Sequence, residues 1–150
     1  MQRHISIKGD DIYTSWKQHM LDWLTCTRCP LADHSHRRVL LRGKIPADIL
    51  FIGEAPGESE DAVGVPFVGP AGNLLDQIAE AALGKWKIRC AVTNIVACFP
   101  NTAGNGRVAI GKPKRSEIEK CRPRLEDVIA ICSPKLIVTV GKISENNLPP

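Results

Sequence analysis

The sequence lacks any stretch typical of a secretory signal or a membrane span. Its N-terminus, MQRHISIKGDD, is polar and contains no apolar core segment. No apolar run approaches the length of about 18 residues that a spanning helix needs. These absences predict a cytoplasmic protein without a membrane partner.

Positive charge is missing from one long stretch, and negative charge is scarce in the next. Residues 48–84 carry seven acids and no Lys or Arg, whereas residues 85–124 carry ten Lys or Arg and only two acids. This separation predicts a basic surface that meets a polyanion. A solvated basic face without a partner is the competing interpretation.

Alternating apolar patterns predict the fold class. Helical spacing of apolar residues between Asp10 and Leu24 indicates an N-terminal helix. Buried strands are predicted from continuous apolar runs at 47–52, 90–97 and 134–140. Between and after the first two strands, helices are predicted at 71–83 and 116–131, the second beginning at a capping box of Ser116 and Glu119.

Apolar strands that alternate with helices are typical of an α/β fold, with a short parallel sheet and helices on both sides in three layers. The chain shows neither internal repeats nor low-complexity segments. We therefore expect a single domain over 1–150, with an N-terminal helix at 10–25, a core at 26–142 and a C-terminal tail at 143–150. Because two prolines close the sequence where a further helix is expected, we also expect the fold to be C-terminally truncated.

Six cysteines without a secretory signal indicate metal binding or catalysis rather than a disulfide framework. Cys26 and Cys29 form a C-x-x-C, and Cys98 and Cys121 flank a loop rich in Gly, Asn and Pro. Four thiolates fit a structural zinc or an iron–sulfur cluster, and the single close pair favours the cluster. A thioredoxin-like redox pair is disfavoured because this C-x-x-C follows a helix. The other two cysteines are expected to be small buried hydrophobic residues: Cys90 and Cys132.

The stretch GEAPGESED at 53–61 follows the first predicted strand and turns on two glycines and a proline. Such a loop brings backbone close to a ligand, but its four acids oppose a phosphate. Glu54 and Glu60 are its candidate functional residues. A solvated acidic loop is the competing interpretation.

Six motifs stand in one order, and together they resemble the iron–sulfur uracil-DNA glycosylases, most closely the family-4 type found in thermophiles, many bacteria and some phages. The motifs are CTRCPL, GEAPGESED, PFVGPAGNLL, TNIVACFP, KPKRSEIEKCRPRL and PKLIVTVGK. The resemblance covers about 26–142. It implies a sandwich of helices around a short parallel sheet, and a structural 4Fe–4S cluster held by Cys26, Cys29, Cys98 and Cys121.

The implied activity is DNA repair in a bacterial or phage-infected cell. Uracil is flipped out of DNA, and its N-glycosidic bond is hydrolysed to leave an abasic site. By the resemblance, Phe67 stacks on uracil and Asn94 reads its edge, since one amide offers both a donor and an acceptor. From the residues alone, Phe67 could equally belong to the core and Asn94 could satisfy backbone groups at a strand end.

The resemblance also assigns the opening loop. Gly53, Glu54 and Ala55 are expected to line the uracil pocket with backbone N–H groups. Glu60 or Glu54 orients the attacking water or favours the cation-like sugar, and Glu60 is the preferred residue for the water. The basic residues expected to neutralise DNA phosphates are Lys112, Lys114, Arg115 and Arg122.

One expected part is missing. Family members carry a later His-Pro-Ser motif, whose histidine bonds the leaving uracil, whereas all four histidines here precede the first predicted strand: His4, His19, His34 and His36. A non-catalytic or truncated DNA- or uracil-binding protein of the same fold is therefore the alternative, and a zinc-stabilised nucleotide-binding module is the third interpretation. The loop at 101–111 is read as an insertion, and a monomer is expected.

Overall fold

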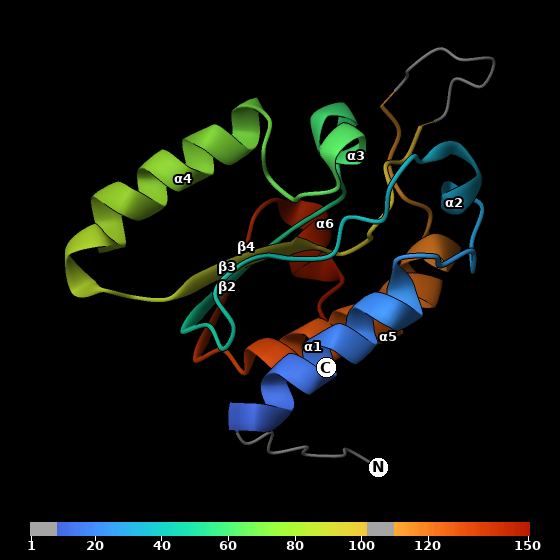
Figure 1. The fold of residues 1–150 in the computed structure, drawn as a ribbon. Coiled ribbons are helices and arrows are strands. Elements are labelled where there is room, and N and C mark those ends of the chain that lie inside the picture. Colours follow the sequence, from blue (N-terminus) through green and yellow to red (C-terminus); the bar gives the residue numbers. More distant parts are fainter. Residues whose placement is uncertain (1–8, 102–109) are drawn as a thin grey trace.

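The computed structural model describes residues 9–101 and 110–150. In this part of the chain a four-stranded sheet lies between helices on both of its faces (Figure 1). The strand order is β1-β3-β2-β4, with β2 parallel to both of its neighbours. The strands are β1 Arg42–Gly43, β2 Ile49–Gly53, β3 Cys90–Asn94 and β4 Leu136–Thr139. The predicted α/β fold is confirmed, but the short edge strand β1, antiparallel to β3, was not predicted.

The long predicted helices are confirmed to within one or two residues: α1 Gly9–Trp23, α4 Pro70–Leu83 and α5 Arg115–Cys132. A one-turn 3-10 helix, Gly84–Trp86, follows α4. Three short helices were not predicted: α2 Leu31–His34, α3 Glu58–Val63 and α6 Lys142–Asn146. The tail expected at 143–150 thus begins as a helix, and its Ile143 and Leu148 pack against the core. No helix in the described ranges combines the length and apolar character needed to cross a membrane.

The capping box predicted at Ser116 is wrong by two residues. Lys114 is the extended residue before α5, and Glu117 accepts its backbone N–H at 2.6 Å. Glu119 lies too far into the helix to reach back, and it instead pairs with Arg115 at 3.0 Å. The helix therefore starts earlier, with Ser116 exposed on its first turn.

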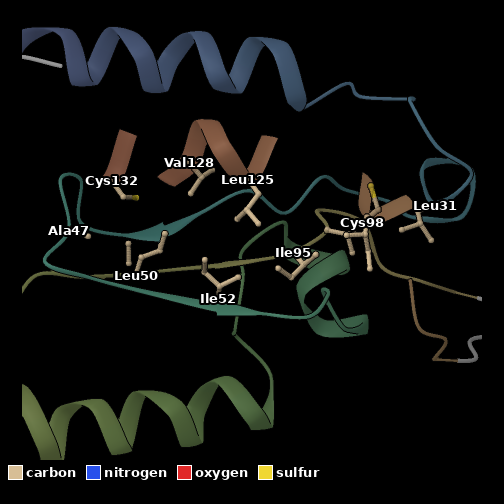
Figure 2. Packing of buried hydrophobic residues seen from close by; sticks show 12 residues of the cluster. Leu31, Ala47, Leu50, Ile52, Ile95, Cys98, Leu125, Val128 and Cys132 are labelled. Atoms are coloured by element: carbon tan, nitrogen blue, oxygen red, sulfur yellow. The ribbon is translucent and has the colours of Figure 1, made fainter. Parts of the chain in front are cut away.

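Helix α5 supplies the support for the sheet. Leu125 and Val128 point from α5 toward Leu50 and Ile52 of β2, and all four side chains are almost completely buried (Figure 2). Truncating such a core leucine to alanine costs about 2–5 kcal/mol. Helix α1 covers the outer side of α5 (Figure 1). This packing holds the carboxyl ends of β2 and β3 in place, where the loops of interest begin.

Candidate functional site

A cavity lies where strands β2 and β3 end. Their last residues, Gly53 and Asn94, are partners in the parallel register. Ligands of open α/β sheets bind at this edge, outside the carboxyl ends of the strands. The cavity volume of about 380 Å³ falls within the range of about 300–1,000 Å³ for small-molecule sites. Its lining residues are Ala55, Gly57, Glu58, Ser59, Glu60, Phe67, Gly69, Pro70, Ala71, Gly72, Asn94 and Ile110.

Asn94 lines this cavity, and its side chain has an unsatisfied group. The residue is 2% exposed, and its amide nitrogen Nδ2 has no hydrogen-bond partner among the described residues. A buried donor without a partner costs about 1–3 kcal/mol. An unpaired amide on the wall of a cavity therefore indicates a ligand that completes the bond.

Phe67 lies beside Asn94, and two glycines make room for it. A Cβ added at Gly53 would stand 2.4 Å from Phe67 Cζ and 2.6 Å from Asn94 Oδ1. A Cβ at Gly72 would stand 1.9 Å from the Phe67 carbonyl oxygen. The Phe67 backbone has a φ of 57°, in the left-handed region that aromatic residues rarely adopt. The sequence therefore places the ring against the end of β2 at a conformational cost.

Arg42 of the edge strand β1 holds this backbone, a role that the sequence did not reveal. Its Nε donates to the Pro66 carbonyl at 3.0 Å, and its Nη2 donates to the Phe67 carbonyl at 3.3 Å. The same Nη2 donates to Asp76 Oδ1 of α4 at 2.9 Å. Arg42 thus joins the sheet edge, the Phe67 turn and α4.

Glu60 binds two glycine-containing loops together from the first turn of α3. Its Oε2 accepts the Gly57 N–H at 2.9 Å, and its Oε1 accepts the N–H groups of Val68 at 3.0 Å and Gly69 at 2.8 Å. The residue is 9% exposed. A carboxylate offers about four acceptor sites, so three are already used by the backbone. The competing interpretation of a solvated acid is wrong for Glu60.

The three residues that open the loop are placed differently from one another. Ala55 lines the cavity, and Gly53 contacts Phe67 and Asn94. Glu54 is half-buried and lies outside the cavity lining. The backbone carbonyls of Gly53 and Glu54 accept N–H groups of Ile95 and Val96, at 2.8 and 3.3 Å. These bonds join the opening loop to the segment that follows β3.

Asp61 is a second buried acid of the same loop, and sequence reasoning assigned it no role. It is 2% exposed and accepts the backbone N–H groups of His36 at 2.9 Å and Arg37 at 3.1 Å. Its Oδ2 also lies 2.7 Å from His36 Nδ1. Asp61 therefore ties α3 to the segment after α2. Two of the four acids of the stretch GEAPGESED thus serve the architecture of the loop.

Four of the six cysteines, the ones that the resemblance implies as cluster ligands, line one small cavity. They come from the turn after α1, the segment after β3 and the interior of α5: Cys26, Cys29, Cys98 and Cys121. Cys132 is fully buried in the core, as expected, whereas Cys90 is only half-buried. Four basic residues also line this cysteine cavity: Arg28, Arg38, Lys120 and Arg124.

Two thiols of this cavity, those of Cys29 and Cys98, have raised pKa values. Burial raises the pKa of Cys98 to about 11, with Cys121 and Cys29 nearby raising it further and Ser35 and Arg38 opposing the rise. Burial also raises the pKa of Cys29. Metal binding needs deprotonated thiolates, so binding here would release protons. The nearby basic side chains favour the thiolate form that a metal requires.

The predicted phosphate contacts lie around the start of α5. Lys112, Lys114 and Arg115 are exposed, and Arg122 is half-buried. Cations at the N-terminus of a helix oppose its dipole. The stability of α5 therefore does not explain why these basic residues lie there. A solvated basic face that meets no DNA is the competing interpretation. The insertion expected at 101–111 falls mainly on 102–109, outside the described residues.

Residues 42–149 match the family model described as the uracil DNA glycosylase superfamily. A type-4 uracil-DNA glycosylase of Sulfurisphaera tokodaii is 41% identical over 121 residues, which are 81% of this chain and 52% of that protein. A type-4 uracil-DNA glycosylase of Pyrobaculum aerophilum is 39% identical over 123 residues, or 82% of this chain and 59% of that protein. One of Archaeoglobus fulgidus is 35% identical over 121 residues, or 81% and 57%. The chain thus spans a little over half the length of the curated relatives it matches.

Proposed function

Because the chain belongs to the uracil-DNA glycosylase superfamily, we propose that it takes part in DNA repair by excising uracil from DNA. The base would leave the helix, enter the cavity at the ends of β2 and β3, and be released by hydrolysis of its N-glycosidic bond. We place this activity in the cytoplasm of a bacterial or phage-infected cell and expect a monomer.

The observation that carries the proposal is the unpaired amide of Asn94 beside the ring of Phe67. Uracil presents O4 and N3–H on one edge, and an amide can donate to the first and accept from the second. Cytosine presents the opposite pattern and leaves both amide groups mispaired. Phe67 supplies the aromatic face on which a flat base stacks.

The acids of the opening loop take separate roles in this proposal. Glu60 already accepts three backbone N–H groups, so we assign it to positioning the two loops that form the cavity wall. The Glu54 carboxylate has no hydrogen bond or ion pair with the other described residues, and together with Glu58 it is one of the two loop acids that the backbone does not occupy. We therefore favour Glu54 over Glu60 for orienting the water or favouring the cation-like sugar.

The cysteine cavity is proposed to hold a 4Fe–4S cluster on Cys26, Cys29, Cys98 and Cys121, with structural zinc as the alternative. Within the described ranges, no group of three or more His, Cys, Asp or Glu is arranged to hold a metal ion. A tetrahedral zinc with bonds of about 2.3 Å needs its sulfurs about 3.8 Å apart. An iron–sulfur cluster separates its thiolates more widely, and we favour it because only Cys26 and Cys29 form a close pair in the sequence. When bound, the group would supply a cross-link between the turn after α1, the segment after β3, and α5.

DNA binding is assigned to the basic residues at the start of α5. Lys112, Lys114, Arg115 and Arg122 would neutralise phosphates, a contact that gives affinity but no sequence information. The stretch at 48–84 has no Lys or Arg. The cavity at the ends of β2 and β3, here called the base cavity, therefore does not attract phosphate.

A second candidate is a protein that binds uracil in DNA without excising it. No histidine is present among the described residues that line the base cavity. A donor to the leaving base is worth on the order of 3–4 kcal/mol in comparable sites. Binding does not need that donor, whereas fast excision does.

The two candidates separate in one assay. Labelled oligonucleotides of one sequence, with uracil, thymine or cytosine at a single site, are incubated with the protein and then heated in alkali to cut abasic sites. The enzyme proposal expects cutting at uracil alone. Selective binding of the uracil oligonucleotide without cutting would support the second candidate, and the absence of both would contradict both.

A further inference from the structure

Arg124 of α5 is the most deeply buried charged residue among those described, with 0% exposure. It lines the cysteine cavity on one side and contacts the end of β3 on the other. No role in uracil excision or in metal binding has been assigned to it above. Its position between the two sites makes it a candidate for coupling them.

The guanidinium holds the backbone of the base-reading residue. Nη2 donates to the Asn94 carbonyl, and also to the Ile95 carbonyl at 3.2 Å. Nη1 donates to Thr93 Oγ1 at 3.1 Å and reaches the Leu40 carbonyl at 3.5 Å. Thr93 Oγ1 itself donates to the Leu40 carbonyl at 2.6 Å. These bonds leave little freedom to the peptide groups that carry Asn94.

Arg124 forms no ion pair in the described part of the chain, and only a longer-range attraction links it to Asp127, whose pKa it helps to lower. All of its hydrogen-bond acceptors are neutral, and no carboxylate there forms an ion pair with it. Its Nε is buried without any partner. Asp127, one turn further along α5, accepts from Trp23 at 3.1 Å and lies 3.6 Å from His19 instead. A buried cation without a counter-charge is strongly unfavourable.

The four cysteines of the shared cavity can supply that counter-charge. Bound to a zinc ion or to an iron–sulfur core, four thiolates outweigh the positive charge they surround and leave a net charge of about −2. Arg28, Arg38 and Lys120 line the same cavity, so the anionic centre would meet several cations there. Arg124 is the one among these four residues that also contacts the end of β3.

We propose that Arg124 is a positioning residue that couples the metal centre to base reading. The thiolate-bound centre balances its charge, and the balanced guanidinium then holds the Asn94 and Ile95 carbonyls so that the Asn94 amide faces the base. This inference rests on the proposed function, since it assumes that Asn94 reads uracil. It predicts that uracil recognition depends on the metal centre and on the fork shape of the guanidinium.

Two variants of the full chain test the charge and the fork shape of the guanidinium separately. Arg124→Met removes both the charge and the donors at similar volume, whereas Arg124→Lys keeps the charge and loses the planar fork. Val128→Ala is the matched control, because Val128 is equally buried on α5 and is absent from the linings of the base and cysteine cavities. This control variant measures the effect of losing core packing alone.

The first measurement is binding discrimination. Anisotropy gives the affinity for a single-stranded oligonucleotide with one 2′-fluoro-2′-deoxyuridine, which resists excision, against the same sequence with thymidine. Both Arg124 variants are expected to lose about tenfold or more of the preference for uracil, with thymidine binding changed less than about twofold. Val128→Ala keeps the preference. Full discrimination by a folded Arg124→Lys protein would overturn the positioning role.

The second measurement is retention of the metal centre, followed as release of iron or zinc to a chelator. Arg124→Lys is expected to release metal at nearly the wild-type rate, and Arg124→Met at least about fivefold faster than Val128→Ala. Equal release by the Met and control variants would overturn the charge-balance role. If wild-type protein does not distinguish uracil from thymine, the proposed function fails, while this measurement still decides the link between Arg124 and the metal centre.

Discussion

Two carboxylates bind the loop N–H groups beside the base cavity, whereas two guanidinium groups bind carbonyls beside the cysteine cavity. Glu60 accepts three backbone N–H groups, and Asp61 accepts two more together with a contact to His36. On the other side, Arg38 donates to the Cys26 carbonyl at 2.7 Å, and Arg124 donates to carbonyls after β3. Negatively charged side chains thus restrain the backbone beside the base cavity, and positively charged side chains restrain it beside the cysteine cavity.

The difference between the two regions lies in how complete they are. The Glu60 carboxylate has most of its acceptor sites filled and sits in the first turn of a helix, where the dipole favours an anion. Arg124 leaves Nε unpaired, and no carboxylate among the described residues forms an ion pair with it. Protein atoms therefore satisfy the loop N–H groups around the base cavity, whereas the cysteine cavity leaves a charge that our proposal balances with a bound anionic centre.

The largest expected effect tests the base cavity through Asn94→Asp. The carboxylate cannot donate to uracil O4, so excision should fall by about 10²–10³-fold. Single-turnover excision rates measure this loss, and Asn94→Ala should show a similar one without the added charge. Circular dichroism checks that the fold is kept. Unchanged excision in a folded variant would show that Asn94 is not the reader.

A second effect tests the carboxylate side through Glu60→Ala. The variant leaves the N–H groups of Gly57, Val68 and Gly69 without their acceptor, and we expect a loss of about 2–4 kcal/mol in the free energy of unfolding. Urea unfolding measures it. Glu58→Ala, in the same helix but exposed, should stay within about 0.5 kcal/mol of wild type. Equal effects from both changes would remove the special role of Glu60.

Gly53→Ala tests how closely the cavity wall is packed. The new methyl would meet the Phe67 ring and the Asn94 amide, so we expect about 1–3 kcal/mol of destabilisation and weaker uracil binding. The double variant with Phe67→Leu should recover part of the stability, because the smaller side chain removes the clash. Additive losses in the double-mutant cycle would contradict this packing.

The smallest expected effect concerns Asp48, a carboxylate at the other end of the sheet that forms ordinary ion pairs with basic side chains. Asp48 contacts Arg89 at 3.0 Å and Lys135 at 3.4 Å, and hydrogen bonds from Arg89 hold the pKa of Asp48 well below its usual range. A lowered pKa stabilises the fold above the unfolded value of about 3.9, and that contribution is lost as the pH falls below it. Melting temperatures of Asp48→Asn should therefore fall less steeply in acid than those of wild type. Parallel curves, or a difference that high salt does not reduce, would contradict the pairing.

The sequence predicted the parts that depend on local pattern. Continuous apolar runs predicted β2, β3 and β4. Since the carboxyl ends of neighbouring parallel strands meet at one edge of a sheet, these strands also bring Gly53 and Asn94 together. The four cysteines were selected through the family resemblance, after Cys90 and Cys132 had been set aside for their apolar surroundings. Phe67 and Asn94 were chosen through the family resemblance, and the structure places them side by side.

The residues that sequence reasoning missed act through side-chain direction across long separations. Arg42 reaches Phe67, and Arg124 reaches Asn94, over 25 and 30 positions. Glu60 was selected as the candidate for orienting the water, and its bonds to the Gly57, Val68 and Gly69 N–H groups were not foreseen because only tertiary packing turns it inward. No local signal distinguishes Arg124 from Arg122 two positions earlier, yet one is fully buried and the other half-buried.

Hydrogen exchange before and after metal removal tests the contrast between the two regions most directly. Removing the bound centre should speed amide exchange at 95–98 and around Cys121 by tenfold or more, because the cations there lose their counter-charge. The amides of 57–69, held by Glu60 and Asp61, should exchange at the same rate as before. Equal acceleration in both regions, or none near the cysteines, would contradict the account.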